Sequence, residues 1–438
     1  MTGNASFSPL AKLLVLLMVV VGCAKLEKEK PPQIVTAGPH ALAMGATLTI
    51  AATTVNATDP SYTFASTKTD VATVDEQGVV RPVAPGETIV TVTGTSSRAV
   101  GLHPVVVIAT DDKAQIPYYD KWMTSAHADA TSVPFTNWNK QGSVPVECAR
   151  CHSSEGFVDY LGGDGSAPGT VEQAAPIQSV VRCQTCHNPA AVALTSVTFP
   201  SGVTVKGLGG EARCMTCHQG RASGADVDAE IAKAGVANDD QVSAALHFKN
   251  IHYFPAAATL FAGRAKGGYQ YAGQTYDVRF RHVDGKDTCI GCHDPHSTKV
   301  RFDTCTACHT GVTDVVGARG IRMMSSAGRD YDGDRNTTEG IYDELIGLRG
   351  KVLAAIAQYG TEHQTPICYS VSSYPYWFAD GNADGTCDAT ESVSANAFKG
   401  WTARLLRATY NFQLASKDPG AFAHNAKYIV QLLYDSVT

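Results

Sequence analysis

The sequence predicts a chain of two parts: a small N-terminal β-sandwich, then a loop-rich, mainly α-helical part that ends in long helices. Three observations predict this fold. Residues 34–109 contain no Cys and alternate apolar with polar side chains at period two. Residues 110–310 are rich in Gly and Pro, hold ten of the 13 Cys and contain one expected helical stretch near residues 226–246. Residues 340–438 space their apolar side chains at helical intervals.

The first residues predict export. Lys12 precedes an apolar run over residues 13–21 that is too short to span a bilayer. Residues 1–22 are therefore predicted to be a signal peptide. The run ends in Val-Val-Gly-Cys23, which resembles a bacterial lipobox and implies cleavage before Cys23 and lipidation of that thiol. An ordinary signal peptide with a chance Cys is the alternative.

Residues 23–33 are charged and end in Pro, as expected for a tether between a lipid and a folded part. We therefore expect an exported lipoprotein of the outer membrane or cell surface, with a periplasm-facing position also open. The formal net charge is -6, and Lys and Arg form no basic stripe. This charge pattern argues against a nucleic-acid partner.

Strand-like runs and turn signals follow each other over residues 34–109. Residues 47–50 and 88–92 are strand-like, whereas 75–78 and 84–86 are turn signals. Residues 70–88 resemble the group 2 bacterial immunoglobulin-like domain. That resemblance implies a spacer or adhesion module without chemistry of its own. Two His lie in this segment, and we expect both at the surface: His40 and His103.

The motif Cys-x-x-Cys-His occurs five times between residues 148 and 309. It is the signature of covalent c-type haem attachment, in which two thiols add to the haem vinyl groups and the His binds the iron. The sequence therefore predicts five haem c groups. The attaching Cys are Cys148, Cys151, Cys183, Cys186, Cys214, Cys217, Cys289, Cys292, Cys305 and Cys308. The proximal ligands are His152, His187, His218, His293 and His309.

Seven of the 14 His remain after the proximal ligands and the two in the β-rich segment are set aside. Five irons need five distal ligands, so bis-His ligation of every haem is possible, and such ligation gives low potentials. The predicted distal ligands are His127, His252, His282, His296 and His424. The other two, His247 and His363, are expected to be core or surface residues.

Two Cys, Cys368 and Cys387, belong neither to the haem motifs nor to the lipobox. In an exported protein we expect them to form a disulfide, with two buried free thiols as the alternative. Residues 380–391 fit the twelve-residue EF-hand loop, and so predict a structural Ca²⁺ site. Its oxygen donors would be Asp380, Asn382, Asp384, Thr386 and Glu391.

A second acidic loop begins in the same way with Asp330, Asp332 and Asp334. It lacks Gly at its sixth position and Glu at its twelfth. We therefore expect Ca²⁺ here only with a different closing ligand. The alternative for both loops is a solvated acidic turn.

Residues 116–438 resemble the multihaem c-type cytochromes of metal-respiring bacteria. The resemblance depends on the five motifs, the run Cys-His-Asp-Pro-His over 292–296 and the segment 421–428. It implies a pentahaem electron carrier, not an enzyme, that passes electrons to metal oxides or partner cytochromes. Two alternatives stay open. One is a reductase of nitrite, hydroxylamine or tetrathionate type with one open haem, and the other is a subunit of an extracellular filament. All five motifs end in His, which favours the carrier.

Overall fold

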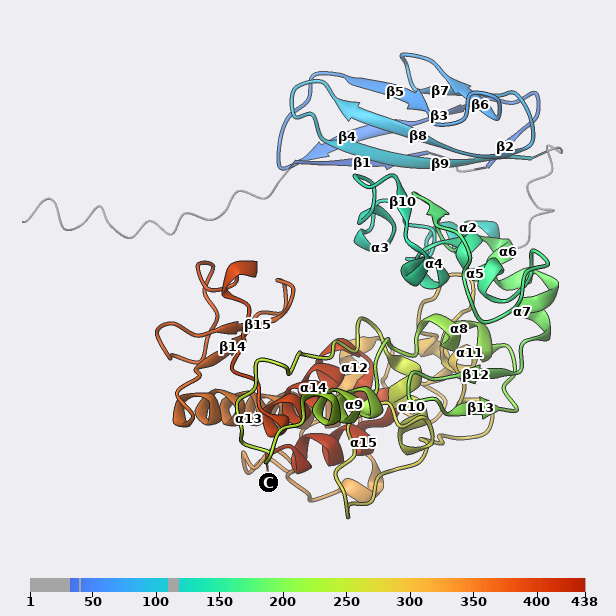
Figure 1. Ribbon diagram of the computed structural model, residues 1–438. Coiled ribbons are helices and arrows are strands. Elements are labelled where there is room, and N and C mark those ends of the chain that lie inside the picture. The colour runs from blue at the N-terminus through green and yellow to red at the C-terminus, as the bar shows by residue number, and fades with distance from the viewer. Residues whose placement is uncertain (1–31, 39–40, 109–117, 438) are drawn as a thin grey trace, which may run out of the picture. The chain divides into compact units, whose positions relative to one another are not determined.

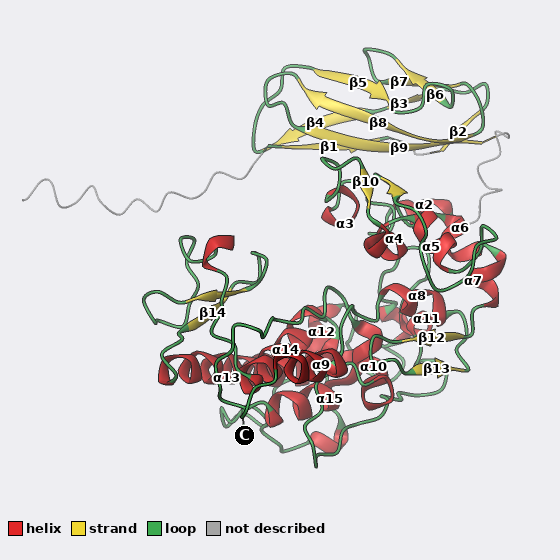
Figure 2. Cartoon of the chain, in the orientation of Figure 1, coloured by secondary structure: helices red, strands yellow, loops and turns green. Residues whose placement is uncertain are grey.

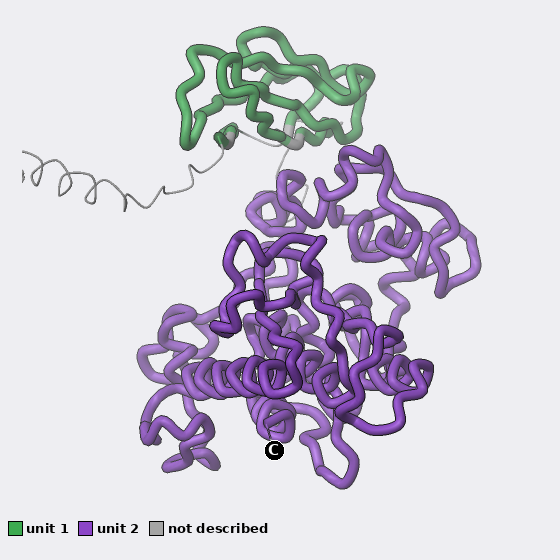
Figure 3. The backbone as a smooth tube through the Cα atoms, turned by 60° about the vertical axis from the view of Figure 1, so that its left-hand side comes forward, with its two compact units in different colours: residues 1–117 green, residues 118–438 purple. Residues whose placement is uncertain are grey.

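The computed structural model describes residues 32–38, 41–108 and 118–437 of the chain (Figure 1). By its internal contacts the chain divides into two compact units, residues 1–117 and 118–438 (Figure 3). The predicted signal peptide, the lipidation residue Cys23 and His40 lie outside the described residues. Within the described ranges, no helix has the length and apolar character needed to cross a membrane.

The first unit consists of short strands in small sheets. One sheet has four strands in the order β2-β9-β8-β5, another has three in the order β3-β7-β6, and β1 pairs with β4. Neighbours are antiparallel except β2 and β9. The strands are β1 (Gln33–Ala37), β2 (Ala41–Ala43), β3 (Leu48–Thr49), β4 (Ala51–Val55), β5 (Tyr62–Ser66), β6 (Ala72–Val74), β7 (Val79–Pro82), β8 (Gly86–Gly94) and β9 (Val100–Ile108).

The two larger sheets share one apolar core. Val80 of β7 belongs to the same buried cluster as Val92 of β8 and Val105 of β9. The predicted turn over residues 75–78 joins β6 to β7, with the Gly78 amide donating to the Asp75 carbonyl at 3.0 Å. Gly78 has φ +77°, a left-handed conformation that favours glycine, and a Cβ there would lie 2.8 Å from the Ile50 carbonyl oxygen. The period-two pattern thus does produce a strand-rich unit.

One prediction for this unit is wrong. His103 lies on β9 and is fully buried, not at the surface. Its strand turns Val105 and Val107 to the same inner face, and a residue two positions earlier must point the same way. The His103 ring makes a 3.2 Å hydrogen bond with the Thr36 hydroxyl, which satisfies one of its nitrogens.

The second unit begins with short helices separated by loops (Figure 2). Its first helices are α2 (Tyr119–Met123), α3 (Val133–Thr136), α4 (Val146–His152), α5 (Ser154–Tyr160), α6 (Cys183–His187), α7 (Pro189–Ala193), α8 (Glu211–Cys217), α9 (Gly224–Ala234), α10 (Ala256–Ala265), α11 (Cys289–Cys292) and α12 (Val315–Arg319). Its strand pairs are β10 (Ser143–Val144) with β11 (Ala175–Pro176), β12 (Ser196–Thr198) with β13 (Thr204–Lys206), and β14 (Ile367–Tyr369) with β15 (Trp377–Ala379).

The second unit ends in three longer helices, as the helical spacing predicts: α13 (Ile341–Glu362), α14 (Ala403–Lys417) and α15 (Ala421–Asp435). A fourth predicted helix, near residues 226–246, is shorter than expected. It ends at Ala234, because Gly235 takes a left-handed conformation with φ 61° and caps it. Short 3-10 turns occur at Phe302–Thr304, Met324–Ser326 and Ser394–Asn396.

The C-terminal helices hold the loop 267–269 in place through buried polar groups. The Tyr410 hydroxyl donates to the Gly267 carbonyl at 2.8 Å, and the Gly268 amide donates to the Tyr428 hydroxyl at 3.0 Å. Asn411 makes a hydrogen bond with both backbone groups of Tyr269. This core therefore anchors the loop segment that leads to the fourth Cys-x-x-Cys-His motif.

Candidate functional site

Each of the five Cys-x-x-Cys-His segments forms a helical turn. Four lie in α4, α6, α8 and α11, and the fifth follows a 3-10 turn. The amide of the motif His donates to the carbonyl of the first Cys in the third, fourth and fifth motifs, at 3.0, 2.8 and 2.9 Å. Residues three and four apart share one side of such a turn. Both thiols and the imidazole are therefore on the same side, as one haem requires.

Backbone carbonyls fix the orientation of three motif imidazoles. The Nδ1 atoms of His152, His218 and His293 donate to backbone carbonyls at 2.9, 3.2 and 3.0 Å, respectively. A donated Nδ1 hydrogen leaves the lone pair on Nε2, which is the usual metal-binding arrangement of an imidazole. The accepting carbonyls belong to Pro134, Phe254 and Thr298. Sequence reasoning missed these three acceptors, because a backbone carbonyl leaves no signal in the residue type.

Four motif His face four of the predicted distal His. Two bonds of about 2 Å from a metal to opposite nitrogens place the ring centroids about 6 Å apart. The observed centroid separations match this value. They are His152–His252 5.8 Å, His187–His296 6.2 Å, His127–His218 6.3 Å and His282–His309 5.9 Å. Each pair therefore leaves room for one iron between its rings.

Other aromatic pairs in this unit have a similar spacing: the centroids of Phe199 and Phe261 are 6.4 Å apart, and those of Phe280 and His282 are 6.1 Å apart. The four His pairs are distinguished by their members, because each joins a motif His to a predicted distal His. Burial, followed by the charge of His218, lowers the pKa of His127 to about 4. Burial, followed by the charge of His152, does the same for His252. Both imidazoles are therefore neutral and able to bind a metal.

The fifth predicted distal ligand, His424 on α15, has no ring contact with a motif His in the described part of the chain. Its Nδ1 makes 2.9 Å hydrogen bonds with both carboxylate oxygens of Asp418. Asp418 is buried, and this carboxylate–imidazole arrangement is typical of metal-ligating His. The charges of His424 and His293 both act on His218, so each of these two rings lies near His218. Sequence reasoning missed Asp418.

The two His not predicted as ligands lie elsewhere. The His247 side chain is 73% exposed, and its Nδ1 makes a 2.9 Å hydrogen bond with Glu230. His363 packs on Tyr359 and donates to the Tyr359 carbonyl. Neither ring contacts a motif His among the described residues.

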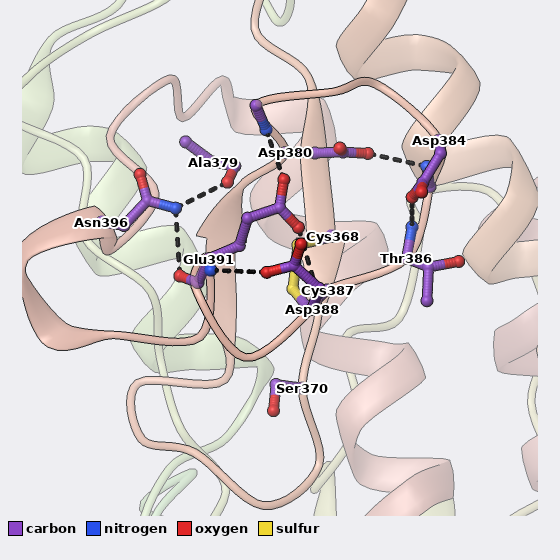
Figure 4. The surroundings of a disulfide bond; sticks show 12 residues. Cys368, Ser370, Ala379, Asp380, Asp384, Thr386, Cys387, Asp388, Glu391 and Asn396 are labelled. Carbon is purple, nitrogen blue, oxygen red and sulfur yellow. Dashed lines mark hydrogen bonds between the residues drawn. A yellow bond between two sulfur atoms is a disulfide. The ribbon is translucent and has the colours of Figure 1, made fainter. Parts of the chain in front are cut away.

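A disulfide joins Cys368 to Cys387 and ties β14 to the acidic loop 380–391 (Figure 4). Within this loop Asp380 Oδ2 accepts from the Gly385 amide at 2.7 Å, and Asp384 Oδ1 accepts from the Thr386 amide at 2.8 Å. Asp380 Oδ1 is buried and has no hydrogen-bond partner. A buried carboxylate oxygen without a partner is costly, so it fits a cation ligand.

Glu391, predicted to close the same loop, uses both oxygens within the protein. Its carboxylate accepts from the Gly381 amide at 2.7 Å and from the Asp388 amide at 3.1 Å. Asn382 Oδ1 accepts from the Asp384 amide at 3.0 Å. Glu391 thus links residues 381 and 388 within the loop. Among the described residues, the groups of three close carboxylates lie in the second acidic loop and not in this one.

The second acidic loop gathers more carboxylates than the sequence predicted. Asp332 is 6% exposed and Glu344 on α13 is fully buried. Arg322 pairs with Glu344 at 2.6 Å. Two groups have carboxylate oxygens within 4.8 Å of one another: Asp330 with Asp332 and Glu344, and Asp332 with Asp334 and Glu339. Sequence reasoning missed Glu344, although it stands in the first turn of a predicted helix.

Comparison with known proteins gives one clear relationship. The chain is 26% identical over 361 residues to the C-type polyheme cytochrome OmcB of Geobacter sulfurreducens, which covers 70% of this chain. The chain is homologous to polyheme c-type cytochromes. It is also 27% identical over 373 residues to OmcC of the same species, covering 73% of this chain. The chain spans about half the length of these relatives, 46% in each case.

Other comparisons add little. No protein-family model matches the chain. Among solved structures, an intimin mutant of EHEC O157:H7 is 12% identical with a TM-score of 0.16, covering 41% of this chain and 92% of its own. The intimin–Tir90 complex is 13% identical with the same TM-score, covering 38% and 75%. Scores this low support no conclusion about the first unit.

Proposed function

We propose that this homologue of OmcB and OmcC is an electron carrier with five covalently attached haem c groups, each held by two His. The observation that supports it is the set of four His pairs spaced for an iron, beside motifs that present two thiols each. The bound haem supplies reversible one-electron chemistry. The chain attaches it, ligates it and limits the access of water.

The fifth iron, at His293, takes His424 as its distal ligand in this proposal. His424 is the remaining predicted ligand. It lies near His218, and so does His293, because the charges of both act on His218. With two His ligands on every iron, the chain lacks the open coordination position that a haem reductase needs. Electron transfer, rather than reduction of a bound small molecule, is then the function.

The test is quantification of covalent haem together with low-temperature electron paramagnetic resonance of the oxidised full chain. Five haems per chain, all low-spin, are expected. A high-spin ferric signal equal to one whole haem would overturn full bis-His ligation and favour the reductase. Electron microscopy of the same sample separates the carrier, expected as discrete particles, from a filament subunit.

Electrons must enter and leave through haem edges near the surface. Of the ten motif Cys, Cys183 and Cys308 are exposed and the others are partly buried. We propose that other redox proteins or extracellular metal and mineral acceptors meet the protein at these edges. A lipid on Cys23 and an immunoglobulin-like spacer would keep the carrier tethered at the outer membrane or cell surface. Release of a Cys23→Ala variant from the membrane fraction tests the anchor.

We further propose that the two acidic loops bind structural Ca²⁺. The buried, unpaired Asp380 Oδ1 supports a site in the loop 380–391. The buried carboxylates of Asp332 and Glu344 support one in the second loop, where their oxygens and those of Asp330 lie within 4.8 Å of one another. Calorimetric titration of the chelator-treated protein with Ca²⁺ is expected to give two sites, and no heat of binding would exclude both.

A further inference from the structure

Helix α8, which holds the third motif, contacts the helices of two other motifs. It packs against α4 of the first motif and α11 of the fourth. The Cys217 sulfur is 3.7 Å from the Arg150 carbonyl, inside the first motif. On another side, Arg213 Nε donates to the Ala191 carbonyl at 3.1 Å, just after the second motif. The third motif therefore lies beside the first, second and fourth motifs.

The fifth motif has a different neighbour. The Arg301 amide, just before it, donates to the Cys292 carbonyl of the fourth motif at 2.8 Å. His282, just before the fourth motif, faces His309 of the fifth. The fifth motif is therefore packed against the fourth.

Thioether sulfurs bond to the edge of the porphyrin, so motifs that pack against one another bring their haem edges close together. Electrons pass between haems through such close edges. We propose that the haem of Cys214 and Cys217 is the branch point of the electron path. It adjoins the haems of the first, second and fourth motifs, and the fifth haem joins only through the fourth. This inference rests on the proposed haem-carrier function.

The test measures which haems sense one another's charge. A reduced haem carries one more electron than an oxidised one, and this charge lowers the potentials of near neighbours most. His127→Met gives the third haem a His–Met pair and raises its potential, so that this haem stays reduced while the others titrate. His282→Met does the same to the fifth haem and is the matched control. Nuclear magnetic resonance of the haem methyl groups follows each haem separately during a redox titration.

In His127→Met, the midpoints of the first, second and fourth haems are expected to shift downward, with no shift in the fifth. In His282→Met only the fourth haem is expected to shift. A shift confined to the second and fourth haems in His127→Met would show a linear order along the chain and overturn the branch.

If His127→Met fails to fold, the iron positions in an electron cryomicroscopy map of the unaltered protein decide the matter. The third iron is then expected to have the first, second and fourth irons as nearest neighbours, and any other arrangement overturns the branch. Absence of covalent haem would instead remove the proposed function itself. A pyridine haemochrome measurement on the same sample therefore separates the two failures.

Discussion

The imidazole of His296 lies parallel to that of His187, with the ring planes 2° apart and the centroids separated by 6.2 Å. His296 stands three residues after His293, so one short loop serves two motifs. Asp294 fixes this loop, because its carboxylate accepts from the His296 and Ser297 amides at 3.1 and 2.9 Å. An exposed ion pair with Lys121 at 2.8 Å ties the loop to α2. The loop that follows the fourth motif thus holds His296 opposite the His of the second motif.

This relationship predicts the effect of His296→Met. The variant gives the second haem a His–Met pair, which raises its potential on the order of 0.1 V within the roughly 0.8 V range set by axial ligands. A spectroelectrochemical titration should show one of five haems shifted upward. His363→Met is the control, because His363 packs on Tyr359 away from every motif His of the described chain, and it should leave all five unchanged. Five unshifted haems in His296→Met would contradict the assignment.

The sequence singled out five His as candidate distal ligands but predicted no partner for any of them. His282 precedes the fourth motif but faces His309 of the fifth, and His127 precedes the first but faces His218 of the third. Loops without regular periodicity carry these residues, so nothing in local spacing encodes the pairing. The motifs themselves need only one helical turn, and for that reason five local patterns were enough to locate them.

Two wrong predictions, the exposure of His103 and the length of the helix near residues 226–246, could have been corrected from the sequence. The period-two alternation over residues 34–109 also requires His103 to share a face with Val105 and Val107. Gly235 precedes the predicted helix end at residue 246, and Gly is the residue that most often ends a helix. Glu344 differs from these, because it reaches the acidic loop only after α13 packs beside it. A carboxylate supplied from a following helix cannot be found from loop spacing alone.

Asp418 should control the ligand strength of His424. In Asp418→Asn the amide accepts a weaker hydrogen bond from Nδ1, and loss of such support costs about 10–100-fold in metal affinity. A fraction of one haem is then expected to become high-spin in the paramagnetic resonance spectrum. Glu230→Gln alters a similar carboxylate–imidazole contact at the exposed His247, and it should leave the spectrum unchanged. A fully low-spin spectrum in Asp418→Asn would show that His424 needs no such support.

The Cys368–Cys387 disulfide should stabilise the C-terminal part without affecting the haems. It closes a loop with a sequence separation of 19, for which chain entropy gives about 3 kcal/mol. The double variant Cys368→Ala, Cys387→Ala is expected to unfold at lower denaturant concentration, with the absorption spectrum and haem content unchanged. Loss of haem in this variant would mean that the disulfide guides the folding of the haem region as well.

Calcium should stabilise the protein through Asp380. Saturation at 100 times the dissociation constant adds about 2.7 kcal/mol per site, so the melting temperature should rise when Ca²⁺ is added to chelator-treated protein. Asp380→Asn removes the charge of a buried carboxylate whose Oδ1 has no other partner, and it should lose the part of this rise that comes from the loop 380–391. Glu76→Gln changes an exposed carboxylate of the first unit and should keep the full rise. A calcium response in Asp380→Asn equal to that of the unaltered protein would remove this loop from the calcium-binding sites and leave the second acidic loop, with Asp332 and Glu344, as its source.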